Sequence, residues 1–130
     1  MTAGAPAFCT VEFVRGSGLH RESPFVPGLP VLRNGPPGTF VTFAGGRRVP
    51  LPTDQIVSAD DGSGAARVSF GGMRWVGIEG GQLTFHRVRD LLPDHELSPE
   101  RRRRMTLAPE MVAAVFMEGR LVWGRPLGVP

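Results

Sequence analysis

The chain of 130 residues is predicted to be mainly β, a small antiparallel barrel or sandwich with one or two short helices near the C-terminus. The main support is the stretch Ala65–Val88, where apolar and polar residues alternate around Gly-Gly pairs at 71–72 and 80–81. Such pairs favour tight hairpin turns because these turns need positive φ. Shorter alternating runs, bounded by glycine and proline, precede this stretch and indicate further strands.

The two glycine pairs predict a ribbon of three antiparallel strands. With the first pair as a two-residue loop, Phe70 lies opposite Met73. With the second turn at Glu79–Gln82, Arg74 lies opposite Arg87. Since side chains alternate across a strand, one face is predicted to be core; it carries Val68, Phe70, Met73, Trp75 and Val88. The other face has an apolar end, made of Val76, Ile78, Leu83 and Phe85, and a basic end.

The basic end of the second face consists of Arg67, Arg74 and Arg87. Like charges that face each other across strands are unfavourable unless an opposite charge balances them. The pattern therefore predicts an anion- or partner-binding site. The alternative is a set of solvated guanidinium groups whose stems cover apolar neighbours.

A second arginine group is predicted to lie on a helix. Ser98-Pro99-Glu100 is typical of a helix start, with a capping hydroxyl and a proline at the first helical position. The helix is predicted to run from Arg101 to about Leu107. Residues on a helix are spread by 100° each, so consecutive arginines cannot form one flat patch. Arg101, Arg102 and Arg104 are added to the predicted anion- or partner-binding residues.

Residues 1–38 are predicted to be an extended arm rich in proline and glycine, with one strand at Thr10–Arg15, and residues 39–130 a β-rich domain. Prolines at 24, 27, 30, 36 and 37 exclude a helix and favour an extended path. The arm is too apolar for a linker that makes no contacts. It is predicted to dock on its own domain or on a neighbouring subunit through Phe25, Val26, Leu29, Val31 and Leu32.

Two interpretations remain open for residues 109–117. Pro109 and Glu110 favour a helix that ends at Gly119, followed by a strand at Arg120–Trp123. The β-branched valines favour instead a hairpin, in which Val112–Met117 turns at Glu118-Gly119. The helix is slightly preferred.

Composition excludes several kinds of chemistry. All fifteen basic residues are arginine, which excludes a lysine Schiff base and a P-loop lysine. Cys9 is the only cysteine, so it is expected to be a small buried apolar residue. His20, in a predicted Gly/Ser turn, His86 and His95 are not spaced for a zinc site. No catalytic residue, metal or cofactor is predicted.

The order of several segments resembles that of LytTR-type DNA-binding domains. A basic strand region is followed by Asp90–Pro93, by the arginines at 101–104 and by Val112–Val115. The resemblance covers about half of the chain, and the usual His-Arg-Ser segment is replaced by Arg102-Arg103-Arg104. It implies DNA binding, and it assigns no individual residue.

The expected function is that of a non-catalytic structural or assembly subunit, such as a virion or tail component. Its expected partners are further copies of the chain or a larger protein assembly. The alternative is a regulatory domain that binds DNA or RNA through the arginines, although a net charge of +3 is modest for that role. A small enzyme using His95 or His86 is a third reading. With no signal peptide or membrane span indicated, the expected location is the cytoplasm or a virion.

Overall fold

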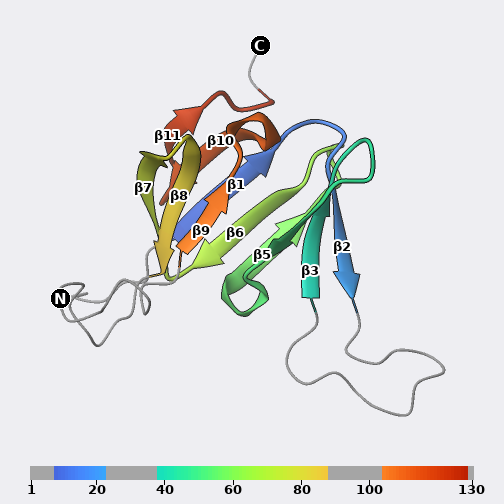
Figure 1. Ribbon diagram of the computed structural model, residues 1–130, viewed down its shortest axis with the longest axis horizontal. Coiled ribbons are helices and arrows are strands. Elements are labelled where there is room, and N and C mark those ends of the chain that lie inside the picture. Colours follow the sequence, from blue (N-terminus) through green and yellow to red (C-terminus); the bar gives the residue numbers. More distant parts are fainter. Residues whose placement is uncertain (1–7, 23–37, 88–103, 129–130) are drawn as a thin grey trace.

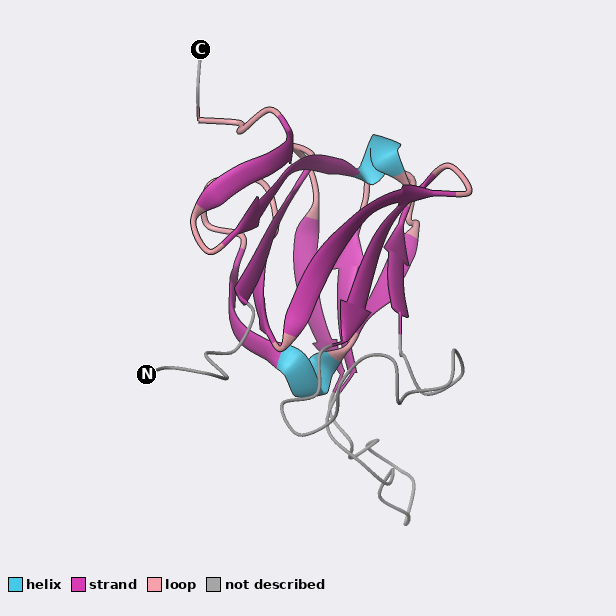
Figure 2. Ribbon diagram, turned by 90° about the vertical axis from the view of Figure 1, so that its left-hand side faces the viewer, coloured by secondary structure: helices cyan, strands magenta, loops and turns pink. Residues whose placement is uncertain are grey.

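The computed structural model describes residues 8–22, 38–87 and 104–128. Within these ranges the chain forms antiparallel strands in three sheets and no α-helix (Figure 1). The predicted mainly β, antiparallel fold class is confirmed. The sheets do not close into a barrel. Figure 2 shows the strands arranged around a common interior, with two short helical turns at opposite ends.

The largest sheet has five strands and contains the first strand of the predicted arm near its centre. In spatial order the strands are β11 (Arg120–Gly124), β10 (Val112–Met117), β1 (Phe8–Phe13), β6 (Arg67–Gly71) and β5 (Ile56–Asp60). On β1, Val11 faces the interior and lies between Val115 and Val68. β1 is therefore part of the main body. The predicted docking residues of the arm, between 23 and 37, lie outside the described residues.

Two smaller sheets complete the interior. One consists of β2 (Gly18–Glu22), β3 (Gly38–Thr42) and β4 (Arg48–Leu51), and the other of β7 (Met73–Glu79), β8 (Gln82–Arg87) and β9 (Arg104–Leu107). Two 3-10 turns, η1 (Thr53–Gln55) and η3 (Pro109–Met111), connect strands. The Gly/Ser turn predicted around His20 is wrong, because His20 lies within β2, opposite Phe40 of β3.

The preferred C-terminal helix at 109–117 is wrong, and the hairpin interpretation is confirmed. Pro109 and Glu110 begin only the single turn η3. β10 then pairs with β1 and β11, and Glu118 and Gly119 form its turn with φ of 51° and 83°. Positive φ at both central residues is the geometry of a tight hairpin turn, which the sequence Glu-Gly permits.

The predicted helix at 101–107 is also wrong over its described part. Residues 104–107 form β9, in which Met105 and Leu107 are buried whereas Arg104 and Thr106 are exposed. This alternation has the period of a strand, and β9 pairs with β8 along its whole length. The capping residues at 98–100 lie outside the described residues, as do Arg101 and Arg102.

The first glycine pair turns a corner between sheets. Phe70 lies opposite Cys9 and Ile56, so the predicted pairing with Met73 is wrong. The amide of Gln55 donates to the carbonyl oxygens of Gly71 and Gly72, at 3.2 Å and 3.0 Å. These bonds hold the corner at which the chain leaves the five-stranded sheet for β7.

The second glycine pair does form the predicted hairpin, with Glu79 opposite Gln82. A β-bulge then skips Val76, next to Gly77 with a φ of 129°. The bulge shifts the pairing by one residue, and such a shift exchanges the faces of a strand.

The core joins the inward faces of all three sheets. Its fully buried large side chains include Phe13, Phe70, Phe85, Met73, Leu83 and Leu107. Val68, Phe70 and Met73 are in the core as predicted, and Trp75 packs against it. Leu83 and Phe85, predicted on the opposite face, are buried instead, and the bulge places Phe85 opposite Trp75. Val88 lies outside the described residues.

Candidate functional site

The predicted arginine site is not assembled as one cluster. Arg67 lies on β6 in the five-stranded sheet, where it faces the carboxylate of Glu12 at 3.6 Å. Its guanidinium also lies 5.5 Å from the ring centre of Phe116. Arg67 is thus occupied by neighbours within its own sheet, and it is in a different sheet from Arg74 and Arg87.

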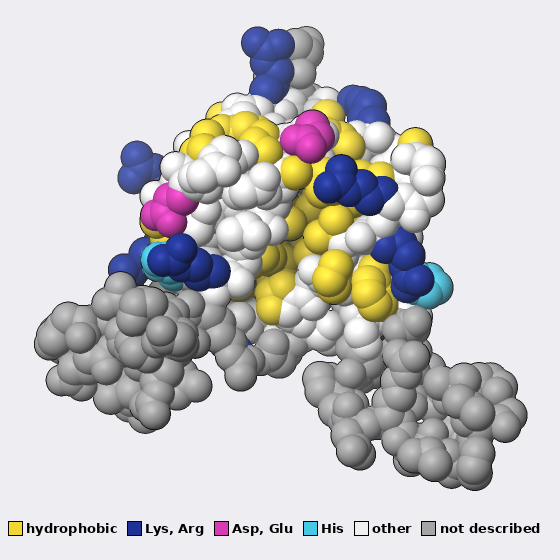
Figure 3. All heavy atoms as spheres, in the orientation of Figure 1, with side chains coloured by type: hydrophobic (Ala, Val, Ile, Leu, Met, Phe, Trp, Pro, Cys, Tyr) yellow, Lys and Arg dark blue, Asp and Glu magenta, His cyan; other side chains and the backbone are white. Residues whose placement is uncertain are grey.

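The other described arginines of the prediction belong to the β7–β8–β9 sheet. Because of the bulge, Arg74 lies opposite His86 and Arg87 lies opposite Met73. Arg104 is also opposite His86, on the other side, and pairs with Glu79 at 3.6 Å. Arg74, His86 and Arg104 therefore form a row across the sheet, while Arg87 is on the inward-facing side. Figure 3 shows arginine side chains in several separate groups on the visible face.

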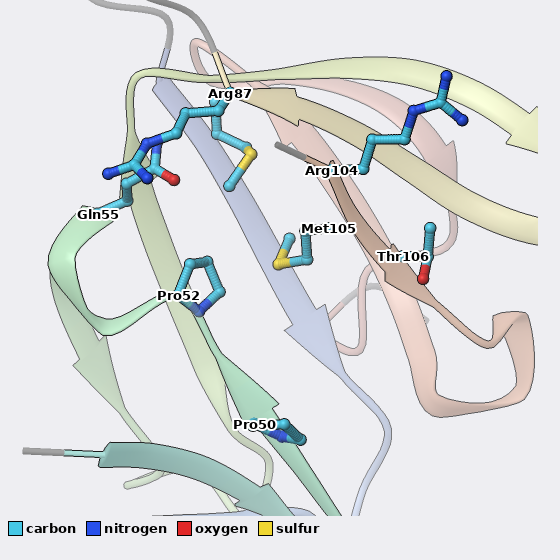
Figure 4. A pocket seen from close by; sticks show the side chains of 8 residues that line it. Pro50, Pro52, Gln55, Arg87, Arg104, Met105 and Thr106 are labelled. Carbon is cyan, nitrogen blue, oxygen red and sulfur yellow. The ribbon is translucent and has the colours of Figure 1, made fainter. Parts of the chain in front are cut away.

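A groove lies between two sheets that do not join. Its cavity has a volume of about 350 Å³ and is lined by Pro50, Pro52, Gln55, Met73, Arg87, Arg104, Met105 and Thr106. Figure 4 shows the two prolines on one side and Met105 with Thr106 on the other. Arg87 reaches toward Gln55 at one end, whereas Arg104 points away. The groove is therefore an opening between β4 and β9, which are edge strands of different sheets.

Most of the large exposed apolar side chains lie on edge strands. The large exposed apolar residues of the described chain are Phe8, Val57, Val76, Ile78, Leu121 and Val122. All but Phe8 belong to β5, β7 or β11, which are edge strands. The pairing of each of these strands skips one valine, at Val57, Val76 and Val122. These β-bulges place apolar side chains in solvent at the same points where they interrupt the edge.

A basic and aromatic surface on the β2–β3–β4 sheet was not predicted. The guanidinium carbon of Arg48 lies 4.3 Å from the ring centre of Phe40, and the His20 ring lies 6.5 Å from the same centre. Arg48 follows Arg47 directly in the sequence, and both are exposed. In the sequence, the Arg47-Arg48 pair could have indicated this basic surface. Its significance depends on strand β2, which the sequence did not reveal.

Cys9 is fully buried in the core, as predicted from its isolation in the sequence. Loss of hydration on burial raises the pKa of its thiol to about 12. A thiol with so high a pKa is protonated at neutral pH and is a poor nucleophile.

Within the described ranges, no group of three or more histidine, cysteine, aspartate or glutamate side chains is arranged to hold a metal ion. The Nε2 atom of His86 is buried and has no hydrogen-bond partner. His95 lies outside the described residues.

Comparison with protein-family models, with curated proteins and with solved structures finds no significant match. In the parts of the chain that are described, no helix has the length and apolar character needed to cross a bilayer.

Proposed function

We propose that the protein is a non-catalytic structural or assembly subunit, a component of an oligomer of the virion or tail type. It acts in the cytoplasm or in a virion, and its partners are further copies of the chain or other subunits. The proline-rich segment at 23–37 supplies the docking arm, through its apolar residues. A segment restricted by prolines loses less conformational entropy when it docks than a flexible one.

The observation that supports this proposal most directly is the open β body with apolar edges. The exposed fractions of Val57, Ile78 and Leu121 are 57%, 55% and 49%. Val76 and Ile78 on β7, and Leu121 and Val122 on β11, give these two edges more than one exposed apolar side chain each, which favours contact with a partner. A cavity of about 380 Å³ beside β11, lined by Leu121 and Val122 among others, provides a concave surface at one of these edges.

The strand ends on either side of residues 23–37 allow this segment to be replaced without disturbing the sheets. Glu22 at the end of β2 lies opposite Gly38 at the start of β3. Two strand ends that face each other can be joined by a two-residue turn such as Asn-Gly. Replacing residues 23–37 by Asn-Gly should therefore leave the fold intact. A truncation that starts at Gly38 would not serve, because it removes β1 from the five-stranded sheet.

The test compares the full chain with this Asn-Gly variant by size-exclusion chromatography with light scattering. We expect the full chain to be oligomeric and the variant to have a lower stoichiometry. Circular dichroism and urea unfolding provide the control that the variant is folded. A full chain that is monomeric at all accessible concentrations, and that recovers no partner, would contradict the proposal.

A nucleic-acid-binding regulator is the second candidate, because of the surface formed by His20, Phe40, Arg47 and Arg48. An arginine beside an aromatic ring on an open sheet is suited to stacking and phosphate contact. Binding of single-stranded DNA or RNA should then weaken steeply with salt. Titration at two salt concentrations tests this, with Arg48→Gln expected to weaken binding and Arg120→Gln as the control. Absence of binding at low salt would remove this candidate.

A further inference from the structure

An apolar pocket lies where three connections of the chain meet. They are the turn after β1, the turn between β3 and β4, and η3, and together they enclose about 260 Å³. The apolar lining consists of Val14, Phe43, Ala44 and Met111. Phe43 packs edge-on against Phe13 of the core, with 6.2 Å between the ring centres. The lining is therefore continuous with the core and held in place by it.

The volume of this pocket favours an anchoring side chain over a free small molecule. Sites for small molecules usually have about 300–1,000 Å³, and the volume of this pocket is below that range. Contacts between proteins, in contrast, commonly depend on a single large side chain that fills a pocket of the partner. The expected occupant is therefore a large apolar side chain of a protein.

Charged side chains complete the lining and restrict the partner further. Arg15 donates to the carbonyl oxygen of Leu127 at 3.0 Å, which fixes its guanidinium beside the pocket. The side chains of Arg47 and Glu110 are exposed, and neither has a hydrogen-bond or ion-pair partner in the described chain. A partner that brings an acid to Arg47 and a base to Glu110 would balance both charges.

The hairpin of β10 and β11 carries this combination. Glu118 is in its turn, and Arg120 and the exposed Leu121 follow directly. The side chains of Glu118 and Arg120 are exposed and also lack a partner in the part of the chain that is described. The N–H of Glu118 donates to the carbonyl oxygen of Phe8 at 2.8 Å, so the turn is held against β1. The hairpin thus presents a leucine beside an acid and a base.

The hairpin of β7 and β8 is a poorer match. It also has an exposed apolar residue, Ile78, next to an acid, Glu79. However, Glu79 already pairs with Arg104 at 3.6 Å. The residues that follow it, Gly80-Gly81-Gln82, supply no base. Of these two hairpins, only that of β10 and β11 offers both charges to a partner.

We propose that Leu121 of one copy inserts into the apolar pocket of a second copy. Glu118 then faces Arg47 of the second copy, and Arg120 faces Glu110. This inference rests on the proposed assembly function and identifies one contact through which the copies associate.

The positions of the two surfaces require a second copy. The pocket lies at the end of the sheet where Phe13 pairs with Val112, and the hairpin turn at the end where Cys9 pairs with Met117. The six residues of β10 separate these ends by roughly 20 Å. A copy therefore cannot fill its own pocket. Since the contact joins two different surfaces, it repeats from copy to copy and gives a ring or a filament.

Chemical cross-linking in full-length protein tests the contact. Cys9 is buried, so introduced cysteines are the accessible thiols in the folded chain. One copy carries Val122→Cys, next to the intact Leu121, and a differently tagged copy carries Ala44→Cys in the pocket. The two are co-expressed and treated with a short bis-maleimide. Val57→Cys, a similarly exposed valine on β5, replaces Val122→Cys as the matched control.

We expect a cross-link between copies with Val122→Cys and none with Val57→Cys. Adding Leu121→Asp to the first copy should abolish it. Arg47→Glu in the second copy should reduce it several-fold, and adding Glu118→Arg to the first copy should restore it. Circular dichroism provides the control that each variant is folded.

A cross-link that survives Leu121→Asp, or that forms equally with Val57→Cys, would overturn the insertion of Leu121. A loss with Arg47→Glu that Glu118→Arg does not restore would overturn the proposed charge pairing. Light scattering separates the two proposals. An oligomer without the cross-link would overturn this contact but leave the assembly function, whereas a monomer without it would overturn both.

Discussion

Glu12 on β1 accepts a hydrogen bond from the backbone N–H of Leu127, with 2.6 Å between its Oε1 and that nitrogen. Arg15 donates to the carbonyl oxygen of the same residue at 3.0 Å. The segment after β11 is thereby fixed against the first strand. The described part of the tail therefore docks on its own sheet.

Replacing Glu12 by alanine should lower the free energy of unfolding by about 1.5–3 kcal/mol, the usual contribution of a hydrogen bond to a charged group. The Glu12 side chain is only 12% exposed, so solvent compensates poorly. Arg67→Ala should cost less than about 1 kcal/mol, because that partner is 52% exposed. Urea unfolding of both variants measures the difference. Equal losses would show that the ion pair, and not the bond to Leu127, matters.

Gly124→Ala should be strongly destabilising. Gly124 has a φ of 82°, and a Cβ there would lie 2.1 Å from the carbonyl oxygen of Ala113. The loss should exceed that of Gly119→Ala. At Gly119 a Cβ has open space, so only the strain of the positive φ remains, and this should cost more than about 1 kcal/mol. Gly128→Ala, with open space and no positive φ, is the neutral control. Thermal unfolding that ranks the three variants differently would contradict this geometry.

Cys9 should make stability depend on pH in the alkaline range. Burial raises its pKa from 9.0 to about 12, so the unfolded chain loses this proton first. The contribution of the protonated Cys9 thiol to the free energy of unfolding is complete below pH 9 and is lost as the pH rises to about 12. The slope reaches about 1.4 kcal/mol per pH unit. With no lysine or tyrosine in the chain, few other groups titrate there.

The measurement is urea unfolding from pH 8 to about 11.5, below the range in which arginine titrates. Cys9→Val should remove most of the slope. A variant as dependent on pH as the original protein would assign the effect to another group.

The hydroxyl groups of Thr10 and Ser69 form a buried hydrogen bond of 2.8 Å between β1 and β6. Thr10→Val leaves the Ser69 hydroxyl without its partner and should cost about 1–3 kcal/mol. Ser69→Ala leaves the Thr10 hydroxyl without its partner and should cost a similar amount of stability. The double variant should be less destabilised than the sum of the two, because neither orphaned hydroxyl remains. Additive losses would mean that the two hydroxyls do not interact in solution.

The sequence predicted hairpins correctly where the turn residues allow one backbone geometry for the turn. Gly80-Gly81 formed the expected hairpin, and Glu118-Gly119 formed the turn of the hairpin interpretation. Gly71-Gly72 carries the same signal and turns a corner instead. At this corner β6 pairs with β1 and β5, and Gln55 bonds to both glycine carbonyls, and no local pattern contains that information.

The predicted arginine site depended on register, and register depended on one bulge. Skipping Val76 places Arg74 opposite His86 and not opposite Arg87. A glycine within a strand, here Gly77, is a known sign of a bulge and could have raised this alternative. The partnership of Arg67 with Glu12 could not have been foreseen, since it requires β1 to lie beside β6.

The pairing of β1 with β10 has a consequence for how quickly the chain reaches this structure. Cys9 pairs with Met117, which lies more than a hundred residues later in the chain. The complete five-stranded sheet therefore forms only after a loop of nearly the full chain has closed. Proteins dominated by such distant pairings refold in milliseconds to seconds. A newly synthesised copy therefore spends that interval with the β10 side of β1 unpaired, and dilution should favour its recovery from denaturant.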